Sequence, residues 1–103
     1  MRKVIDGKRY DTETAEQVCD VSGPHSCDRG NFRWDDTYLY RTPRGRWFLA
    51  GRGGPMSRWA SYNGNTYGSG SGLNAIDADE AREFVERYGT VEDSEKYFTV
   101  EEA

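Results

Sequence analysis

The sequence is poor in several residue types, and each shortage excludes a class of protein. It has two cysteines and one histidine, too few for the disulfide framework of a small secreted domain or for the usual four-ligand zinc site. No apolar run approaches the roughly 18 residues that span a bilayer, and the N-terminal residues lack the apolar segment of a signal peptide. We therefore expect a cytoplasmic protein.

Aliphatic residues are also scarce, because Leu, Ile, Val and Phe together number only 15 of 103 residues. Disorder would additionally require a high net charge, whereas the net charge is −4 and the sequence contains 14 aromatic residues. Aromatic side chains supply the apolar area that the aliphatic ones do not. The composition predicts one small folded domain over residues 1–103.

The charge is distributed unevenly along the chain. Residues 1–76 carry 11 basic and 8 acidic side chains, a balance of +3, and residues 77–103 carry 3 basic and 10 acidic ones, a balance of −7. The two balances sum to the net charge of −4. Such an asymmetry concerns binding partners rather than the fold.

The N-terminal third predicts short elements and a loop. Asp6-Gly7 between strand-like runs favours a tight hairpin from Val4 to Tyr10. Capping residues after Asp11 predict a short helix that ends near Val18. Residues 22–31 are dense in turn-forming residues and predict a loop.

Residues 36–52 predict a central β-hairpin. Two β-prone runs flank Thr42-Pro43-Arg44-Gly45, and the proline favours a type I turn followed by a glycine bulge. This register pairs Leu39 with Leu49 and Arg41 with Trp47 on one face, and it pairs Tyr40 with Phe48 and Tyr38 with Ala50 on the other. Both faces are substantially apolar, so we expect the hairpin at the centre of a sheet.

The C-terminal half predicts a glycine-rich loop over residues 51–72, a short strand over 73–76 and an acidic helical part over 77–98. Asp77 and Glu80 have the spacing of a helix cap, and Ala81, Phe84, Val85 and Tyr88 form one apolar stripe that ends at Gly89. A second start at Thr90 predicts a short helix through Phe98. The expected fold is α+β, an antiparallel sheet with the C-terminal helices packed on one side.

The sequence gives little support for a metal site or a catalytic site. Cys19, His25, Cys27 and Asp28 form the one cluster of ligand type, but the Cys-x7-Cys spacing does not suit zinc. A disulfide between Cys19 and Cys27 and a metal-binding regulator are weaker alternatives. Apart from Cys27 near His25, no nucleophile is paired with a base, and no phosphate-binding glycine motif is present. We expect no catalytic residues, no cofactor, no metal and no enzymatic activity.

Two charged surfaces remain as candidates for binding. Arginines interleave with aromatic residues, a pattern that suits single-stranded nucleic acid, at Arg33, Arg41, Arg44, Arg46, Arg52 and Arg58. Carboxylates at helical spacing can imitate phosphates and dock on a basic groove of another protein. These acidic candidates are Asp79, Glu83, Glu86, Glu92, Asp93 and Glu95.

Several segments resemble a family of small bacterial proteins from phages and other mobile elements. The resemblance lies in residues 4–15, in Leu39-Tyr-Arg-Thr, in residues 45–51 and 53–60, and in the acidic residues 77–83. Several members of such families are anti-CRISPR proteins, which bind an effector complex and block target recognition or cleavage. The resemblance implies binding rather than catalysis, identifies no site residue directly, and implies a location in the cytoplasm of a bacterial host cell. The sequence departs from the family pattern in the 20–35 loop and at Arg52, where an acidic residue is expected.

Two hypotheses follow from the sequence. The first is a non-enzymatic inhibitor of a host defence complex, an anti-CRISPR protein that binds a protein subunit of a CRISPR effector through the acidic residues. Aromatic anchors would be Tyr38, Tyr40 or Trp59, because aromatic residues dominate interface energetics. The second is a small nucleic-acid-binding accessory protein that uses the six arginines. Neither hypothesis involves a membrane or defines an oligomeric state.

Overall fold

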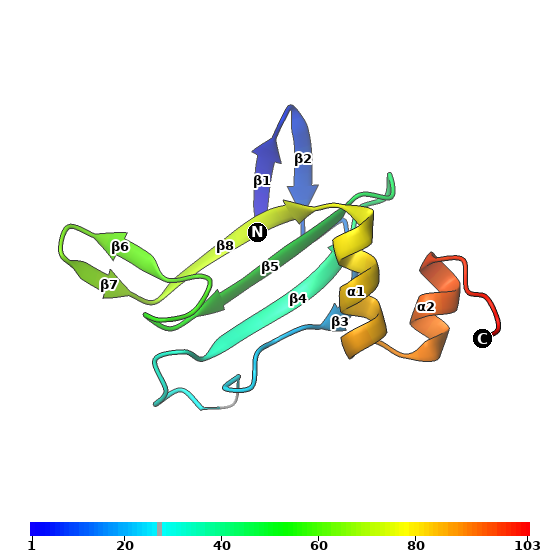
Figure 1. Ribbon diagram of the computed structural model, residues 1–103. Helices are drawn as coiled ribbons and strands as arrows, with labels where there is room; N and C mark the ends of the chain where they lie inside the picture. The colour runs from blue at the N-terminus through cyan, green and yellow to red at the C-terminus, as the bar shows by residue number, and fades with distance from the viewer. Residues whose placement is uncertain (27) are drawn as a thin grey trace.

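A computed structural model describes residues 1–26 and 28–103 and confirms the α+β fold (Figure 1). Four strands form the central antiparallel sheet in the order β3-β4-β5-β8; they are β3 (Glu16–Asp20), β4 (Asp35–Arg41), β5 (Trp47–Gly53) and β8 (Gly70–Ile76). Two separate antiparallel ribbons pair β1 (Arg2–Ile5) with β2 (Lys8–Asp11) and β6 (Ser61–Asn63) with β7 (Thr66–Gly68). The chain ends with helices α1 (Ala78–Tyr88) and α2 (Val91–Tyr97).

The central sheet carries an apolar cluster on each face. On one face, Leu39, Trp47 and Leu49 pack with Ala81 and Val85 of α1. On the other face, the N-terminal ribbon supplies Tyr10, which packs against Phe48 and Leu73. Figure 1 shows the helices beside the sheet, the β1–β2 ribbon standing above it and the β6–β7 ribbon projecting from one end.

The structure confirms the predicted hairpin. The register pairs Leu39 with Leu49, Arg41 with Trp47, Tyr40 with Phe48 and Tyr38 with Ala50. Gly45 adopts a φ of 84°, and its N–H donates to the Thr42 carbonyl over 2.9 Å. The hairpin strands are the two inner strands of the sheet, as expected from two apolar faces.

Both predicted helix starts are also confirmed. The Asp77 carboxylate caps α1 by accepting from the Glu80 N–H at 2.8 Å. Thr90 and Asp93 form a reciprocal capping box at α2. Local side chain-to-backbone bonds of this kind depend on residues only three positions apart, which is why the sequence predicts them well.

The predicted helix between residues 11 and 18 is wrong. One turn does close there, because the Ala15 N–H donates to the Asp11 carbonyl, but the chain then continues as β3. Val18 and Cys19 pack against the helix-side core in this extended form, and β3 pairs along β4. Burial and sheet hydrogen bonds outweigh a local capping preference.

The predicted loop over residues 51–72 is also wrong in most of its length. β5 continues to Gly53, a ribbon forms around Gly64, and β8 begins at Gly70 rather than at residue 73. Glycine is disfavoured in strands by itself, but here Gly51 and Gly72 face each other beneath the Trp59 ring, where a Cβ atom would collide. The 22–31 loop is confirmed for its described residues. Within residues 1–26 and 28–103, neither helix is long and apolar enough to cross a membrane.

Candidate functional site

Exposed carboxylates follow the outer side of both helices. Asp79, Glu83 and Glu86 stand at i, i+4 and i+7 of α1, so they occupy one face of that helix, and all three are exposed. Glu92 and Glu95 are exposed one turn apart on α2. We call these five residues the acidic helical surface.

The sixth predicted acidic residue, Asp93, has a structural role instead. Its carboxylate accepts a hydrogen bond from the Thr90 N–H at 3.0 Å and is only partly exposed. A carboxylate that caps its own helix has less freedom to meet a partner. Asp93 is therefore not part of the acidic helical surface.

In the described part of the chain, no ion pair joins a cation to the acidic helical surface. Among the described residues, ion pairs join Arg29 and Arg52 to Asp36, and Lys96 to Glu16. None of them involves the five acidic residues. Like charges at i and i+4, such as Asp79 and Glu83, destabilise a helix by a few tenths of a kcal/mol, whereas Asp79 in the first turn of α1 interacts favourably with the helix dipole.

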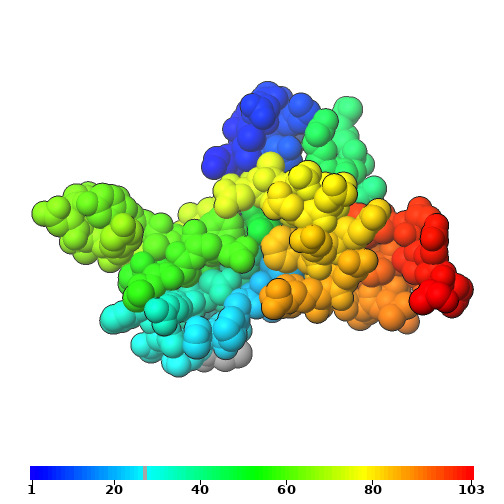
Figure 2. Space-filling view, in the orientation of Figure 1, coloured from blue at the N-terminus to red at the C-terminus, as the bar shows by residue number. Residues whose placement is uncertain are grey.

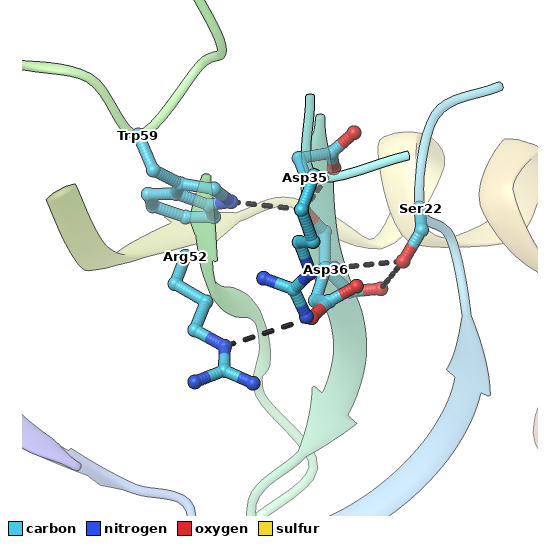
Figure 3. Close-up of polar contacts among 7 residues, drawn as sticks. Ser22, Asp35, Asp36, Arg52 and Trp59 are labelled. Atoms are coloured by element: carbon cyan, nitrogen blue, oxygen red, sulfur yellow. Dashed lines mark hydrogen bonds and ion pairs between the residues drawn. The ribbon is translucent and has the colours of Figure 1, made fainter. Parts of the chain in front are cut away.

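Trp59, one of the predicted aromatic anchors, is a core residue. It is 6% exposed, and its indole N–H donates to the buried Thr37 hydroxyl at 2.8 Å (Figure 3). The prediction that it contacts a partner is therefore wrong. The sequence suggested Trp59 as an anchor because aromatic residues dominate interface energetics, whereas in the structure its ring fills the space above Gly51 and Gly72.

Tyr38 and Tyr40 are half-buried and lie on the sheet face opposite the helices. Tyr40 stacks on Phe48 with ring centroids 5.0 Å apart, within the cluster that the N-terminal ribbon covers. Burial, and secondarily the neighbouring Tyr38, raise the pKa of Tyr40. Both tyrosines and Arg52 line a hollow of about 260 Å³. The acidic helical surface and these two tyrosines therefore cannot form one continuous contact patch.

The six predicted arginines do not form one surface either. Arg52 is paired with Asp36, and the Arg41 guanidinium lies 5.7 Å from the Trp47 ring and 5.6 Å from the Tyr97 ring. Arg58 lines a separate hollow beside Glu80, Glu83 and Arg87 of α1, while Arg33 is exposed in the loop before β4. The structure brings together only Arg44 and Arg46.

Arg44 and Arg46 share a cleft with two cations that the sequence analysis missed. The cleft, of about 820 Å³, lies between the N-terminal ribbon and the β4–β5 turn, and Lys8 and Arg9 line its other wall. We call it the basic cleft. No sequence spacing links these two segments, so only the packing of the ribbon against the sheet reveals their proximity.

An exposed tyrosine pair on the β6–β7 ribbon was also missed. Tyr62 and Tyr67 are 62% and 64% exposed, and their ring centroids lie 4.8 Å apart across the strand pair. The two turn residues are Gly64 and Asn65, with Gly64 at a φ of 67°, and this Gly-Asn dipeptide was a usable hairpin signal. The surrounding glycines obscured it.

Cys19 and His25 show no assembled site for a metal. Cys19 is a free thiol in the helix-side core, and the His25 ring lies 3.3 Å from the Asn31 side-chain amide. Within the part of the chain that the structure describes, no group of three or more His, Cys, Asp and Glu side chains could hold an ion. Cys27, and with it the alternative of a Cys19–Cys27 disulfide, lies outside the described residues.

Three exposed features could contact another molecule. They are the acidic helical surface, the basic cleft and the Tyr62–Tyr67 pair. Comparisons with protein-family models, with curated proteins and with solved structures find no match for this chain.

Proposed function

We propose that this chain is a non-enzymatic inhibitor of a bacterial defence complex, an anti-CRISPR protein that binds a protein subunit of the effector. One observation carries the proposal: five exposed carboxylates lie on two successive helices with no cation within ion-pair distance among the described residues. They belong to a segment with a balance of −7 charges. The choice of a CRISPR effector rests on the resemblance of the sequence to proteins of phages and mobile elements.

A basic nucleic-acid channel is the partner surface that such a face fits. Neighbouring carboxylates on a helix face repeat about every 5–6 Å, which presents a row of negative charge in place of a phosphate backbone. A channel lined by Lys and Arg would attract this row over a long range and accelerate association at low salt. A protein seated in the channel would exclude the target DNA.

The aromatic contribution to this interface differs from the expectation from sequence. Tyr38 and Tyr40 lie on the opposite sheet face and Trp59 is buried, so the binding energy has to come from the helices and their immediate surroundings. Phe84 and the exposed Tyr88 lie beside Glu80 and Glu83 in a hollow of about 310 Å³. These two rings are the nearest apolar contacts to the acidic helical surface on α1.

A phage-restriction assay in cells that carry different CRISPR types tests the proposal. We expect the wild-type chain to restore phage growth against one type, and the Glu83→Lys/Glu86→Lys variant to lose most of that effect. The Glu101→Lys/Glu102→Lys variant is the matched control, because it changes the net charge equally in the exposed segment after α2. It should retain inhibition.

Two results would contradict the proposal. Absence of rescue against every CRISPR type tested would remove the proposed target. Equal inhibition by wild type and by the Glu83→Lys/Glu86→Lys variant would remove the acidic helical surface as the binding site. Circular dichroism of both variants must first show an unchanged helical signal, so that loss of binding is not loss of fold.

A further inference from the structure

We infer that the basic cleft binds phosphate groups of a nucleic-acid backbone. Its two walls come from distant parts of the sequence: β2 and the preceding turn supply Lys8 and Arg9, and the β4–β5 turn supplies Arg44 and Arg46. Figure 2 shows the blue N-terminal ribbon and the green β4–β5 turn side by side on the same side of the molecule. Four cations therefore border one concave space.

The four cations of the cleft have no ion-pair partner among the described residues. All four side chains are exposed. The described residues that line the cleft include no Asp or Glu; besides the four cations they are Gly7, Tyr10, Thr14, Thr42 and Pro43. Four like charges brought together by folding repel one another, and an anionic ligand would relieve this repulsion.

Phosphate is the anion that this donor set suits best. Three of the four cations are arginines, whose planar guanidinium presents paired N–H donors that match phosphate oxygens. Base stacking contributes little here, because Tyr10, the one aromatic ring among the described residues that line the cleft, is 6% exposed and packs edge-on against Phe48. The cleft therefore recognises backbone charge rather than base identity.

The arrangement of the cations favours a run of linked phosphates over a single ion. They line opposite walls of an open cleft of about 820 Å³. Cations on both walls would contact successive phosphates of one strand. None of the five residues of the acidic helical surface lines the cleft, so this inference does not rest on the proposed function.

The test is fluorescence anisotropy with labelled single-stranded DNA of about 12 nucleotides, titrated from about 50 to 200 mM salt. The Arg44→Gln/Arg46→Gln and Lys8→Gln/Arg9→Gln variants each remove two charges from one wall. We expect each to weaken binding about tenfold at the lowest salt. Each should also reduce the slope of log affinity against log salt by about 1.4, since one phosphate contact on a single strand contributes about 0.7.

Arg33→Gln/Arg58→Gln is the matched control, because it removes two exposed arginines that do not line the cleft. It should weaken binding less than about twofold, apart from its small effect on long-range attraction. An equal loss of affinity in the control and in the cleft variants would overturn the inference, because binding would then depend on the total charge of the protein and not on the cleft. Absence of binding by the wild type at about 50 mM salt would overturn it outright.

A second arm separates a nucleic-acid backbone from a small phosphate compound, since the two share the same chemistry. Sodium pyrophosphate is titrated against the bound oligonucleotide, and a trinucleotide is compared with the longer strand. Weak competition and a clear gain in affinity with length support the inference. Displacement by pyrophosphate at stoichiometric concentration, with no gain from length, would reassign the cleft to a small phosphorylated ligand.

Discussion

The indole N–H of Trp59 donates a 2.8 Å hydrogen bond to the hydroxyl of Thr37, and both side chains are buried. The same hydroxyl donates to the Asp35 carboxylate, whose other oxygen accepts from the Gly23 N–H at 2.8 Å. This chain of bonds joins the 54–60 segment, β4 and the start of the 22–31 loop; Figure 3 shows Trp59, Asp35 and Ser22 from these three segments. Every polar atom in it has a partner, which is the condition under which a buried polar network is stabilising.

Thr37→Val should destabilise the fold by about 1–3 kcal/mol, because it leaves a buried indole N–H and a buried carboxylate oxygen without a partner. Urea unfolding monitored by tryptophan fluorescence measures this change. Thr37→Ser keeps the hydroxyl and serves as the control, with a smaller loss from the missing methyl group. Equal destabilisation by both variants would show that packing, not the hydrogen bonds, determines the effect.

Gly72→Ala should destabilise the protein by about 1–3 kcal/mol through overpacking. A Cβ atom at Gly72 would lie 2.9 Å from the Trp59 ring, which is held in place by its own hydrogen bond. The matched variant Gly68→Ala places its Cβ 3.3 Å from the Ser61 hydroxyl on the exposed ribbon and should change stability by less than about 0.5 kcal/mol. Thermal unfolding of both variants gives the comparison, and a Gly72→Ala protein as stable as wild type would contradict the role of the glycine.

Glu16 should make a small, pH-dependent contribution to stability. Its carboxylate accepts a hydrogen bond from the Tyr97 hydroxyl and pairs with Lys96 at 2.9 Å. The hydrogen bond from Tyr97 first, and that from Lys96 second, lower the pKa of Glu16 below its ordinary value of 4.5. The contribution is therefore complete above pH 4.5 and is lost as the pH falls through the lowered pKa of the folded state.

The measurement is the difference in urea midpoint between wild type and Glu16→Gln, taken at neutral pH and at about pH 3. The difference in midpoint should be smaller at about pH 3 than at neutral pH, because the wild-type carboxylate becomes protonated and loses its charge in acid. Glu13→Gln is the control, since Glu13 is exposed and takes part in no ion pair among the described residues. A difference that is constant with pH, or that grows in acid, would refute the assignment.

Cys19 should react slowly with thiol reagents. Burial foremost, and then the charges of Asp93 and Asp20, raise the pKa of its thiol from 9.0 to about 11. At pH 8 this lowers the thiolate fraction about 100-fold relative to a thiol of pKa 9. Iodoacetamide modification of a Cys27→Ser variant, followed by mass spectrometry, measures the rate. Urea-unfolded protein should react far faster, and equal rates in both states would contradict the prediction.

Features that depend on neighbouring residues were predicted correctly from the sequence. The β4–β5 register, the bulge at Gly45 and the caps at Asp77 and Thr90 all follow from interactions within a few positions. The two-sided apolar pattern of residues 36–52 correctly placed that hairpin at the centre of the sheet. Such signals are local, so a single sequence contains them.

Features that depend on distant contacts were not predicted. β3 is extended because Val18 and Cys19 meet the core, and β8 tolerates glycine because Gly72 lies under Trp59. The local preferences of residues 11–18 and 51–72 favoured a helix and a loop. Packing contributes more free energy than these propensities, which amount to less than about 1 kcal/mol per residue.

The candidate binding surfaces also have a part that the sequence predicts and a part that only the tertiary structure reveals. The sequence alone determined that the C-terminal helices are acidic, because helical spacing and charge are both local, and it indicated that arginine is the main cation of the remainder. The tertiary structure decided which charges act together. Tyr38 and Tyr40 lie on the sheet face opposite the acidic helical surface. Of the six predicted arginines, only Arg44 and Arg46 line the same cleft. The tertiary structure also joined Lys8 and Arg9 to Arg44 and Arg46 across a cleft, because side chains more than 30 positions apart become neighbours only when the N-terminal ribbon packs on the sheet.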